Sequence, residues 1–365
     1  MIYRQNNFDA LRLLGAALVL INHSMVLAGD RAFGFASQSM STLGVEMFFA
    51  ISGYMVASSW MRDPNAGRFI LRRARRIMPA LAFVVMVSLA LIGPLVTTVS
   101  ISDYVSHPNT RRYLGNLIFY VSYALPGVFS TNPFPNAVNG SLWTLPVEVM
   151  MYVSTPLLVL LARRHAGLIL LTLLGTLALA MVFYLRHPPA FIILDTEFWS
   201  AATLFPYFVA GAVIATLRME RLLDWRVGIV AFLLMDFTPQ LLGTLQNAAL
   251  CIVLPYAVIA VGQARWPVVA QVGRLGDFSY GTYLWAFPIQ QLVVSLTRPD
   301  FGGWNNVLVA TPFILLMAVV SWYLIERPML KYGSGVAGRS PEGPSTRNWT
   351  IRSREPSAPS ERSAH

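Results

Sequence analysis

Residues 8–29 read FDALRLLGAALVLINHSMVLAG, an almost unbroken apolar run that carries one arginine, Arg12, and one histidine, His23. A helix of this length crosses the hydrocarbon core of a bilayer. Eleven positions separate the two residues, which is about three turns and a rise of roughly 16 Å, so both side chains project from nearly one face. Ionisable groups inside a membrane span are costly and face the protein interior, so this pair indicates a functional site.

The composition predicts an all-α polytopic membrane protein. Of the 365 residues, 55% are hydrophobic and only 12% are charged, which is typical of chains built from membrane-spanning helices. Apolar runs of nearly spanning length recur along the chain and predict about ten transmembrane helices. They cover residues 8–29, 42–61, 77–99, 142–162, 167–185, 199–217, 227–243, 247–263, 279–297 and 306–325.

The basic residues predict the orientation, because cytoplasmic loops of membrane proteins are enriched in lysine and arginine. With the N-terminus inside, every inner loop is basic, and both termini are predicted to be cytoplasmic. The outer loops then hold Arg31, Arg111, Arg112, Arg186 and Arg298. This topology explains most of the net charge of +10, so the lipid bilayer is an expected partner and nucleic acid is not.

A single transmembrane domain is predicted over residues 1–330. Residues 331–365 are rich in Ser, Pro, Gly and Arg and predict a disordered basic cytoplasmic tail. No set of cysteines and histidines has the spacing of metal ligands, so no metal is expected. The sequence leaves the oligomeric state open, a homo-oligomer included.

Two carboxylates lie within predicted spans and are candidates to act with His23. Glu46 opens the second span and Glu148 lies in the fourth. Both spans enter from the outer side, so we expect the three groups to meet at the outer end of a shared cavity. A carboxylate beside an imidazole would orient it as a base. The alternative is a buried polar cluster that only holds helices together.

Arginines gather at the opposite, inner side. Arginine binds phosphate by charge and by the fork geometry of its guanidinium group. Together with Arg12, the cluster favours an anionic, phosphate-bearing ligand, whereas positive-inside topology explains any single arginine equally well. We therefore expect a phosphorylated donor to enter from the cytoplasm and an acceptor to arrive from outside. The clustered arginines taken as candidate ligands are Arg68, Arg72, Arg73, Arg75 and Arg76.

Six motifs in this order resemble those of the membrane acyltransferase-3 family, the O-acyltransferases of bacterial surface polysaccharides and related acceptors. The resemblance covers residues 7–330. The motifs are Phe8-Asp9-x-Leu11-Arg12 with ten residues to His23, Gly44-Val45-Glu46-x-Phe48-Phe49-x-x-Ser52-Gly53, the arginine run to Pro79, Trp143-Thr144-Leu145-x-x-Glu148, Ser279-Tyr280-Gly281-x-Tyr283-Leu284 and Glu326-x-Pro328.

The resemblance implies transfer of an acyl group, usually acetyl, from acyl-CoA to a hydroxyl group of a carbohydrate acceptor, in a multi-pass protein of the bacterial cytoplasmic (inner) membrane. It implies that His23 is catalytic, as general base or as transient acyl carrier, and that Glu46 and Glu148 are the matching acidic positions. Arg12 and the inner arginines would bind the CoA phosphates. Acyl-CoA is then a donor substrate, and no permanently bound cofactor is expected.

Two departures from the family pattern limit this comparison. Many members carry a Tyr-Leu-x-His-x-Pro run, whereas here the run from Tyr283 to Pro288 has no histidine. Some members also carry a C-terminal SGNH-type hydrolase domain, which residues 333–365 are too short to form. Two alternatives stay open: acyl transfer to a small glycosylated metabolite such as a macrolide, and a non-enzymatic glycan transporter or flippase with a buried His/Glu relay.

Overall fold

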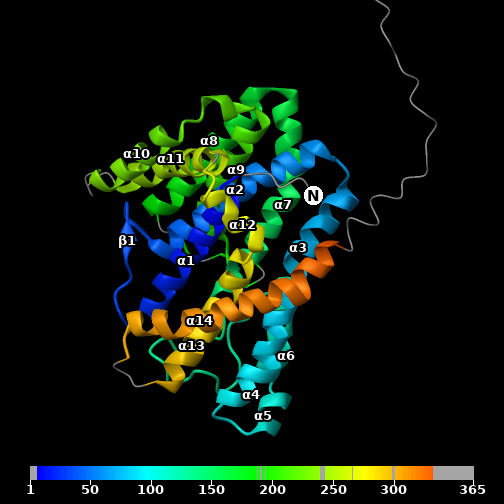
Figure 1. The fold of residues 1–365 in the computed structure, drawn as a ribbon, viewed down its shortest axis with the longest axis vertical. Coiled ribbons are helices and arrows are strands. Elements are labelled where there is room, and N and C mark those ends of the chain that lie inside the picture. Colours follow the sequence, from blue (N-terminus) through cyan, green and yellow to red (C-terminus); the bar gives the residue numbers. More distant parts are fainter. Residues whose placement is uncertain are drawn as a thin grey trace, which may run out of the picture.

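The computed structural model describes residues 6–186, 188–189, 191–193, 195–238, 243–264, 266–297 and 301–331, and these form a bundle of helices (Figure 1). Long helices make up the body: α1 (Phe8–Leu27), α2 (Met40–Arg62), α3 (Ala66–Val87), α7 (Thr144–Arg164), α8 (Ala166–Arg186), α9 (Phe198–Thr216), α11 (Gly243–Gln263), α13 (Ser279–Leu296) and α14 (Gly303–Ser321).

Short elements connect the long helices. The short α-helices are α4 (Gly93–Val96), α5 (Ile101–Ser106), α6 (Pro108–Tyr113), α10 (Trp225–Leu234) and α12 (Val272–Leu275). Two antiparallel pairs of strands are β1 (Gly34–Phe35) with β2 (Gln38–Ser39), and β3 (Ile192–Ile193) with β4 (Thr196–Glu197). The 3-10 and π segments are η1 (Ser88–Ile92), η2 (Leu114–Ile118), η3 (Gly140–Trp143), η4 (Met219–Leu222), η5 (Met235–Phe237), η7 (Val269–Gln271) and η8 (Trp322–Glu326).

The prediction of an all-α polytopic membrane protein is confirmed. Within the described residues, eight helices are long and apolar enough to cross a membrane. The other two predicted spans are α10, which has only ten residues, and α13, which has 18 but is more polar. The predicted tail lies outside the described residues beyond Lys331, which still belongs to the last helix.

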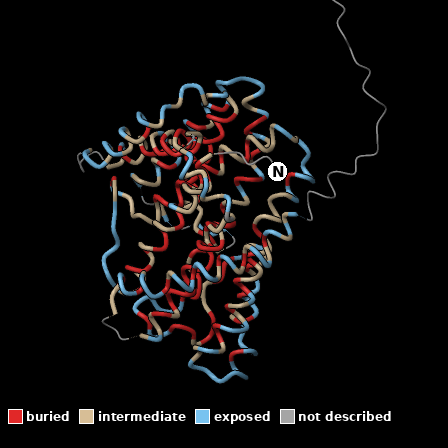
Figure 2. Tube along the Cα trace, in the orientation of Figure 1, coloured by how far each residue is buried: buried red, intermediate tan, exposed pale blue. Residues whose placement is uncertain are grey.

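Burial separates the central helices from the outer ones. Figure 2 shows buried residues concentrated along the middle of the bundle, with exposed residues on its outside. Of the apolar window in α9, 72% of the residues are buried, compared with 22% in α8 and in the helix that begins with α14. The exposed side chains of α8 and α14 are mainly leucine, valine and phenylalanine, so these helices present the apolar surface that a bilayer requires.

Buried polar groups of α13 explain why this helix is less apolar than the spans around it. The Gln290 side chain donates hydrogen bonds to the Leu20 carbonyl (2.8 Å) and to Ser24 Oγ (2.7 Å) of α1. Gln291 donates to the carbonyls of Phe134 and Ala137, both at 2.8 Å. The NH2 groups of both amides thus donate to protein acceptors, and all residues from Gly281 to Gln291 are buried, so this part of α13 lies inside the bundle.

Glycines allow α2 to approach both α1 and α9 closely. A Cβ atom at Gly44 would lie 2.5 Å from the carbonyl oxygen of Gly15 in α1. A Cβ atom at Gly53 would lie 1.9 Å from the carbonyl oxygen of Phe208 in α9. Membrane helices associate largely through such close packing of small residues. Gly15 lies opposite Gly44, and Asn22 hydrogen-bonds with Ser41, so α1 and α2 run antiparallel.

We expect Gly53→Val to separate α2 from α9, because the added side chain overlaps the Phe208 carbonyl. Overpacking of this kind costs about 1–3 kcal/mol. Thermal unfolding of the purified protein in detergent measures the loss. Gly175→Ala in α8 is the matched control, since its Cβ would meet no atom within 4 Å. Equal melting temperatures for the two variants would contradict this account of the α2–α9 contact.

Candidate functional site: an arginine-lined cavity

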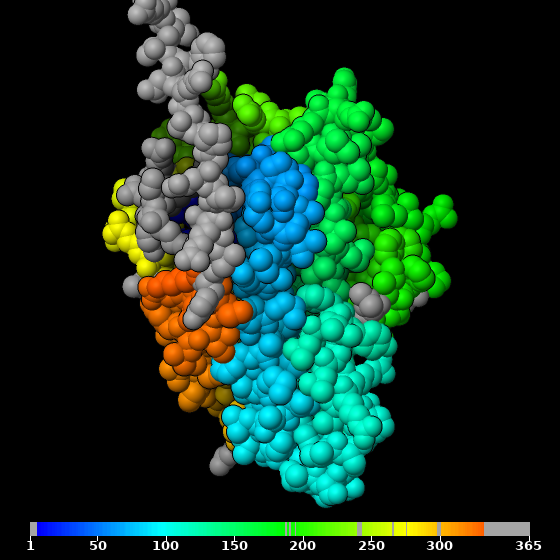
Figure 3. Space-filling model, turned by 90° about the vertical axis from the view of Figure 1, so that its right-hand side faces the viewer, coloured from blue at the N-terminus to red at the C-terminus, as the bar shows by residue number. Residues whose placement is uncertain are grey.

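A cavity of about 750 Å³ lies among α1, α2, α3, α7 and the start of α13. On the face drawn in Figure 3, the blue chain of α3 runs between the orange C-terminal helix and the green helices that follow α7. The α2 residues that line the cavity recur every three or four positions, so they form one face of the helix. They are Val45, Phe48, Phe49, Ser52, Met55, Val56, Ser59 and Arg62. From Val45 to Arg62 this face measures about 25 Å.

One end of this cavity is strongly basic. Arg62 closes the α2 face, and the Arg12 Nη2 group donates to the Met55 sulfur at 2.8 Å, which places Arg12 at that end. The predicted arginine cluster of α3 lines the same cavity, so the structure brings Arg12 and all five clustered arginines together. The lining arginines are Arg12, Arg62, Arg68, Arg72, Arg73, Arg75 and Arg76.

The opposite end of the cavity is apolar with a few hydroxyl groups. Val45, Phe48 and Leu145 line it, and the edge of the Phe48 ring meets the Tyr283 ring at a centroid distance of 5.8 Å. The Tyr283 hydroxyl hydrogen-bonds with Thr144 Oγ1 at 2.8 Å. The cavity therefore has a cationic end for an anion and an apolar end for an uncharged group.

Asp63 holds two of the arginines at the basic end. It follows α2 and accepts hydrogen bonds from Arg68 Nη2 at 2.5 Å and from Arg72 Nη1 at 2.6 Å. These hydrogen bonds, together with the charges of Arg68 and Arg72, hold the pKa of Asp63 well below its usual range. Asp63 therefore stays ionised and keeps both guanidinium groups beside the cavity.

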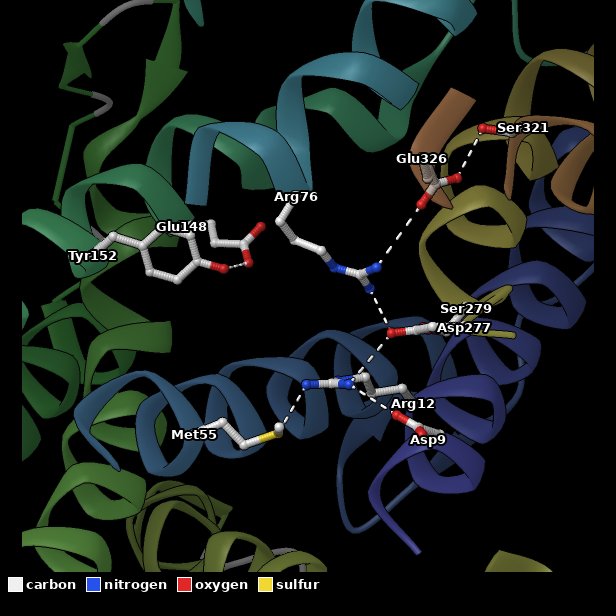
Figure 4. Close-up of polar contacts among 10 residues, drawn as sticks. All are labelled: Asp9, Arg12, Met55, Arg76, Glu148, Tyr152, Asp277, Ser279, Ser321 and Glu326. Atoms are coloured by element: carbon white, nitrogen blue, oxygen red, sulfur yellow. Dashed lines mark hydrogen bonds and ion pairs between the residues drawn. The ribbon is translucent and has the colours of Figure 1, made fainter. Parts of the chain in front are cut away.

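A second carboxylate, Asp277, bridges Arg12 and Arg76 (Figure 4). Its Oδ2 atom lies 2.7 Å from Arg76 Nη2 and 3.4 Å from Arg12 Nη1. Burial alone would raise the pKa of Asp277, but the charges of Arg76 and Arg12 outweigh burial and lower it. Asp277 was not predicted as a site residue, although its position two residues before the Ser279-Tyr280 motif was a usable signal.

Glu148 lines the cavity between its two ends. The Tyr152 hydroxyl donates a hydrogen bond to the Glu148 carboxylate one turn earlier on α7 (Figure 4). Arg73 stacks over the Tyr152 ring, with its guanidinium carbon 5.7 Å from the ring centroid. The predicted acidic residue of the fourth span is therefore next to the basic cluster.

His23 lies beyond the apolar end of the cavity and does not line it. The neighbouring Asn22 donates to Ser41 Oγ at 2.8 Å, so His23 is level with Ser41, about 6 Å along α2 from Val45. The imidazole packs edge-on against Phe287, with centroids 5.4 Å apart. Its Nδ1 atom is buried and has no hydrogen-bond partner within the described part of the chain.

Glu46 is buried on the side of α2 that faces α9 and α11, close to Tyr207 and Cys251. Its neighbour Val45 lines the cavity, but successive helical residues point about 100° apart, so Glu46 points elsewhere. The expectation that Glu46, Glu148 and His23 share a cavity is therefore wrong. No hydrogen bond or ion pair joins any two of them in the described structure.

The residues that the structure describes include no group of three or more His, Cys, Asp or Glu side chains that could hold a metal ion.

Apolar helices around a cavity lined by seven arginines define a multi-pass membrane protein with a strongly basic interior cavity. The model of the acyltransferase domain of the membrane acyltransferase-3 family matches residues 5–326. The chain belongs to this family and is an O-acyltransferase. The family resemblance read from the six motifs is thus confirmed.

Three relatives illustrate the family. The chain is 27% identical to an O-acetyl transferase of Shigella phage Sf6, over 91% of this chain and 98% of the relative. It is 27% identical to nodulation protein 10 of Rhizobium leguminosarum bv. viciae, over 92% and 96% respectively. Identity to the peptidoglycan O-acetyltransferase OatA of Listeria monocytogenes is 26%, over 90% of this chain but only 56% of that relative. No solved structure matches the chain.

We expect Tyr152→Phe to destabilise the protein, because Glu148 then loses a buried hydrogen-bond donor. Leaving a buried polar group without its partner costs about 1–3 kcal/mol. Glu148→Gln removes the charge of this half-buried side chain and keeps an oxygen acceptor for Tyr152, so its melting temperature should fall less. Thermal unfolding of both single variants and of the double variant measures the coupling between the side chains. Additive effects would rule out an energetic role for this hydrogen bond.

Proposed function

We propose that this O-acyltransferase moves an acyl group, in the simplest case acetyl, from cytoplasmic acyl-CoA to a hydroxyl group of an extracytoplasmic polysaccharide or other glycan. The observation that carries the proposal is the polarity of the cavity, with seven arginines at one end and an apolar pocket at the other. A CoA thioester has the matching polarity, since phosphates lie at one end and the acyl group at the other.

The arginines would bind the donor phosphates by charge-assisted hydrogen bonds. The donor arm would then extend along α2, past Glu148, so that the thioester lies near Thr144 and Tyr283. The positive-inside rule assigns the arginine end to the cytoplasm, where acyl-CoA is available. On this assignment the membrane is the bacterial cytoplasmic membrane.

The proposed acceptor class rests on the names of relatives. One relative is a peptidoglycan O-acetyltransferase, and another, from Rhizobium meliloti, is an exopolysaccharide production protein. A polysaccharide hydroxyl outside the membrane is therefore the acceptor that we propose. A small glycosylated metabolite is the runner-up within the same reaction class. Because the family consists of acyltransferases, the alternative of a non-enzymatic carrier is set aside.

We propose His23 as the catalytic residue because it lies inside the bundle, just beyond the apolar end of the cavity. As a base it would take the proton of the acceptor hydroxyl, whose oxygen then attacks the acyl carbon and expels CoA as its thiolate. In the alternative route the acyl group passes first to the imidazole and then to the acceptor. Both routes require the acyl carbon and His23 to come together; Tyr283 lines the cavity, and Phe287, which packs against His23, follows one turn later on α13.

We expect His23→Ala to abolish acyl transfer while the protein still inserts and melts normally. The measurement is loss of radiolabelled acetyl from acetyl-CoA by purified protein in nanodiscs, with a cell-surface glycan extract as acceptor. His165→Ala is the control, since that histidine lies at the C-terminal end of α7, directly after Arg163 and Arg164. Transfer retained by the His23 variant would remove its catalytic role.

We expect donor consumption to depend on the side of the membrane from which acetyl-CoA is added. Inverted membrane vesicles, which expose the cytoplasmic face, should consume labelled acetyl-CoA, whereas right-side-out vesicles should not. In the inverted vesicles, Arg12→Ala should raise the donor KM about tenfold or more, because one charged hydrogen-bonding group is lost. Equal consumption by both vesicle types would overturn the proposed donor side.

A further inference from the structure

We propose that Asp277 is a positioning residue that holds Arg12 and Arg76 as a pair, and that this pair binds one phosphoryl group of the donor. The inference rests on the proposed function, and it assigns a role to a residue outside the six family motifs. It is carried by the contacts drawn in Figure 4, where a single carboxylate oxygen meets both guanidinium groups.

The pairing brings two cations from different helices together. Arg12 comes from α1 and Arg76 from α3, and both line the cavity. Arg12 Nη1 lies 3.4 Å and Arg76 Nη2 lies 2.7 Å from the same Asp277 Oδ2 atom. These two nitrogen atoms are therefore no farther apart than the sum of the two distances. The exposed fractions of the three side chains are only 20%, 23% and 16%, so solvent screens the repulsion between the cations poorly. Asp277 supplies the opposite charge that this arrangement needs.

The backbone holds Asp277 in place. Gly276 has φ = +142°, which disfavours other residues, and a Cβ atom there would lie 2.4 Å from the indole Nε1 of Trp322. Ser279 Oγ donates to Asp277 Oδ1 at 2.5 Å, so the two carboxylate oxygens have different partners. One oxygen is fixed by the start of α13, and the other is left for the arginines.

Each of the two arginines has a further carboxylate within reach. Asp9 Oδ1 lies 3.1 Å from Arg12 Nη1, and Glu326 Oε2 lies 3.8 Å from Arg76 Nη1. The Arg76 guanidinium also stacks over the Tyr280 ring at 5.5 Å. Each guanidinium has five N–H donors, so donors remain available for a ligand in the cavity. Two such groups held side by side match the several oxygens of one phosphoryl group.

A positioning role and a purely electrostatic role predict opposite changes in donor affinity when the charge of Asp277 is removed. Asp277→Asn removes one negative charge from an anion-binding cavity. If the arginines acted only through their summed charge, the variant would bind the donor more tightly. If Asp277 positions them, the variant lets the two cations move apart and binds the donor more weakly. The sign of the change in donor KM therefore distinguishes the two.

The test compares wild type with Asp277→Asn in nanodiscs, with acetyl-CoA as donor. We expect the donor KM to rise about tenfold, because the geometry of charged hydrogen bonds is lost, with kcat and acceptor KM little changed. Ser279→Ala is the milder second variant and should raise the donor KM about threefold, so the proposal stays testable if the first variant fails to fold. Asp195→Asn, which removes a charge paired with Arg112 away from the cavity, should leave the donor KM unchanged.

A donor KM that is unchanged or lowered in Asp277→Asn would overturn the proposal. So would a loss confined to kcat or to melting temperature, which is what a merely structural role predicts. Binding of inorganic pyrophosphate, measured by calorimetry on the same two proteins, separates this inference from the proposed function. Weaker pyrophosphate binding by the variant supports the phosphate pair even if wild type fails to consume acetyl-CoA. Equal pyrophosphate binding, with acetyl-CoA turnover intact in wild type, rejects the pair alone.

Discussion

The ion pairs around the arginine cluster are the constraint on which this structure depends. Charges inside a membrane protein are expensive unless they are paired or reach water. Here the cations of α1 and α3 are matched by carboxylates that come from three other places: Asp63 after α2, Asp277 before α13 and Glu326 in η8. These pairs connect the ends of distant helices at the basic end of the cavity, so the cavity and the stability of the bundle depend on the same interactions.

The close approach of helices at glycine positions determines where the cavity runs. Gly15 and Gly44 bring α1 against α2, and Gly53 brings α9 against α2 on another side. With two faces of α2 occupied by packing, the face that starts at Val45 is left to line the cavity. The same packing explains why Glu46 is buried on the α9 side of α2 and does not line the arginine-lined cavity.

The sequence predicted the membrane class and the basic half of the site, because depth along a span can be read from residue number. The spans that carry Arg12 and Arg76 are predicted to begin on the same side of the membrane, and both residues lie toward that side. The topology therefore predicted that the two arginines would lie close together. The direction in which a side chain points around the helix axis depends on which neighbours pack where, and this is why the expected meeting of Glu46 with His23 was wrong. Asp277 was not predicted because it lies outside every apolar run, in a turn whose position depends on the contact between Gly276 and Trp322.

The lining cations of this cavity are all arginines within the described chain. A guanidinium group keeps its proton at any pH that a cell meets, unlike the imidazole of histidine. The carboxylates Asp63 and Asp277 also stay ionised, because neighbouring arginines lower their pKa values. The basic end therefore behaves as a permanent charge, and acidification of the cell exterior leaves it unaltered. On the proposed orientation and donor, any response of the enzyme to external acidity therefore arises in groups nearer the outer surface, in acceptor handling and not in donor capture.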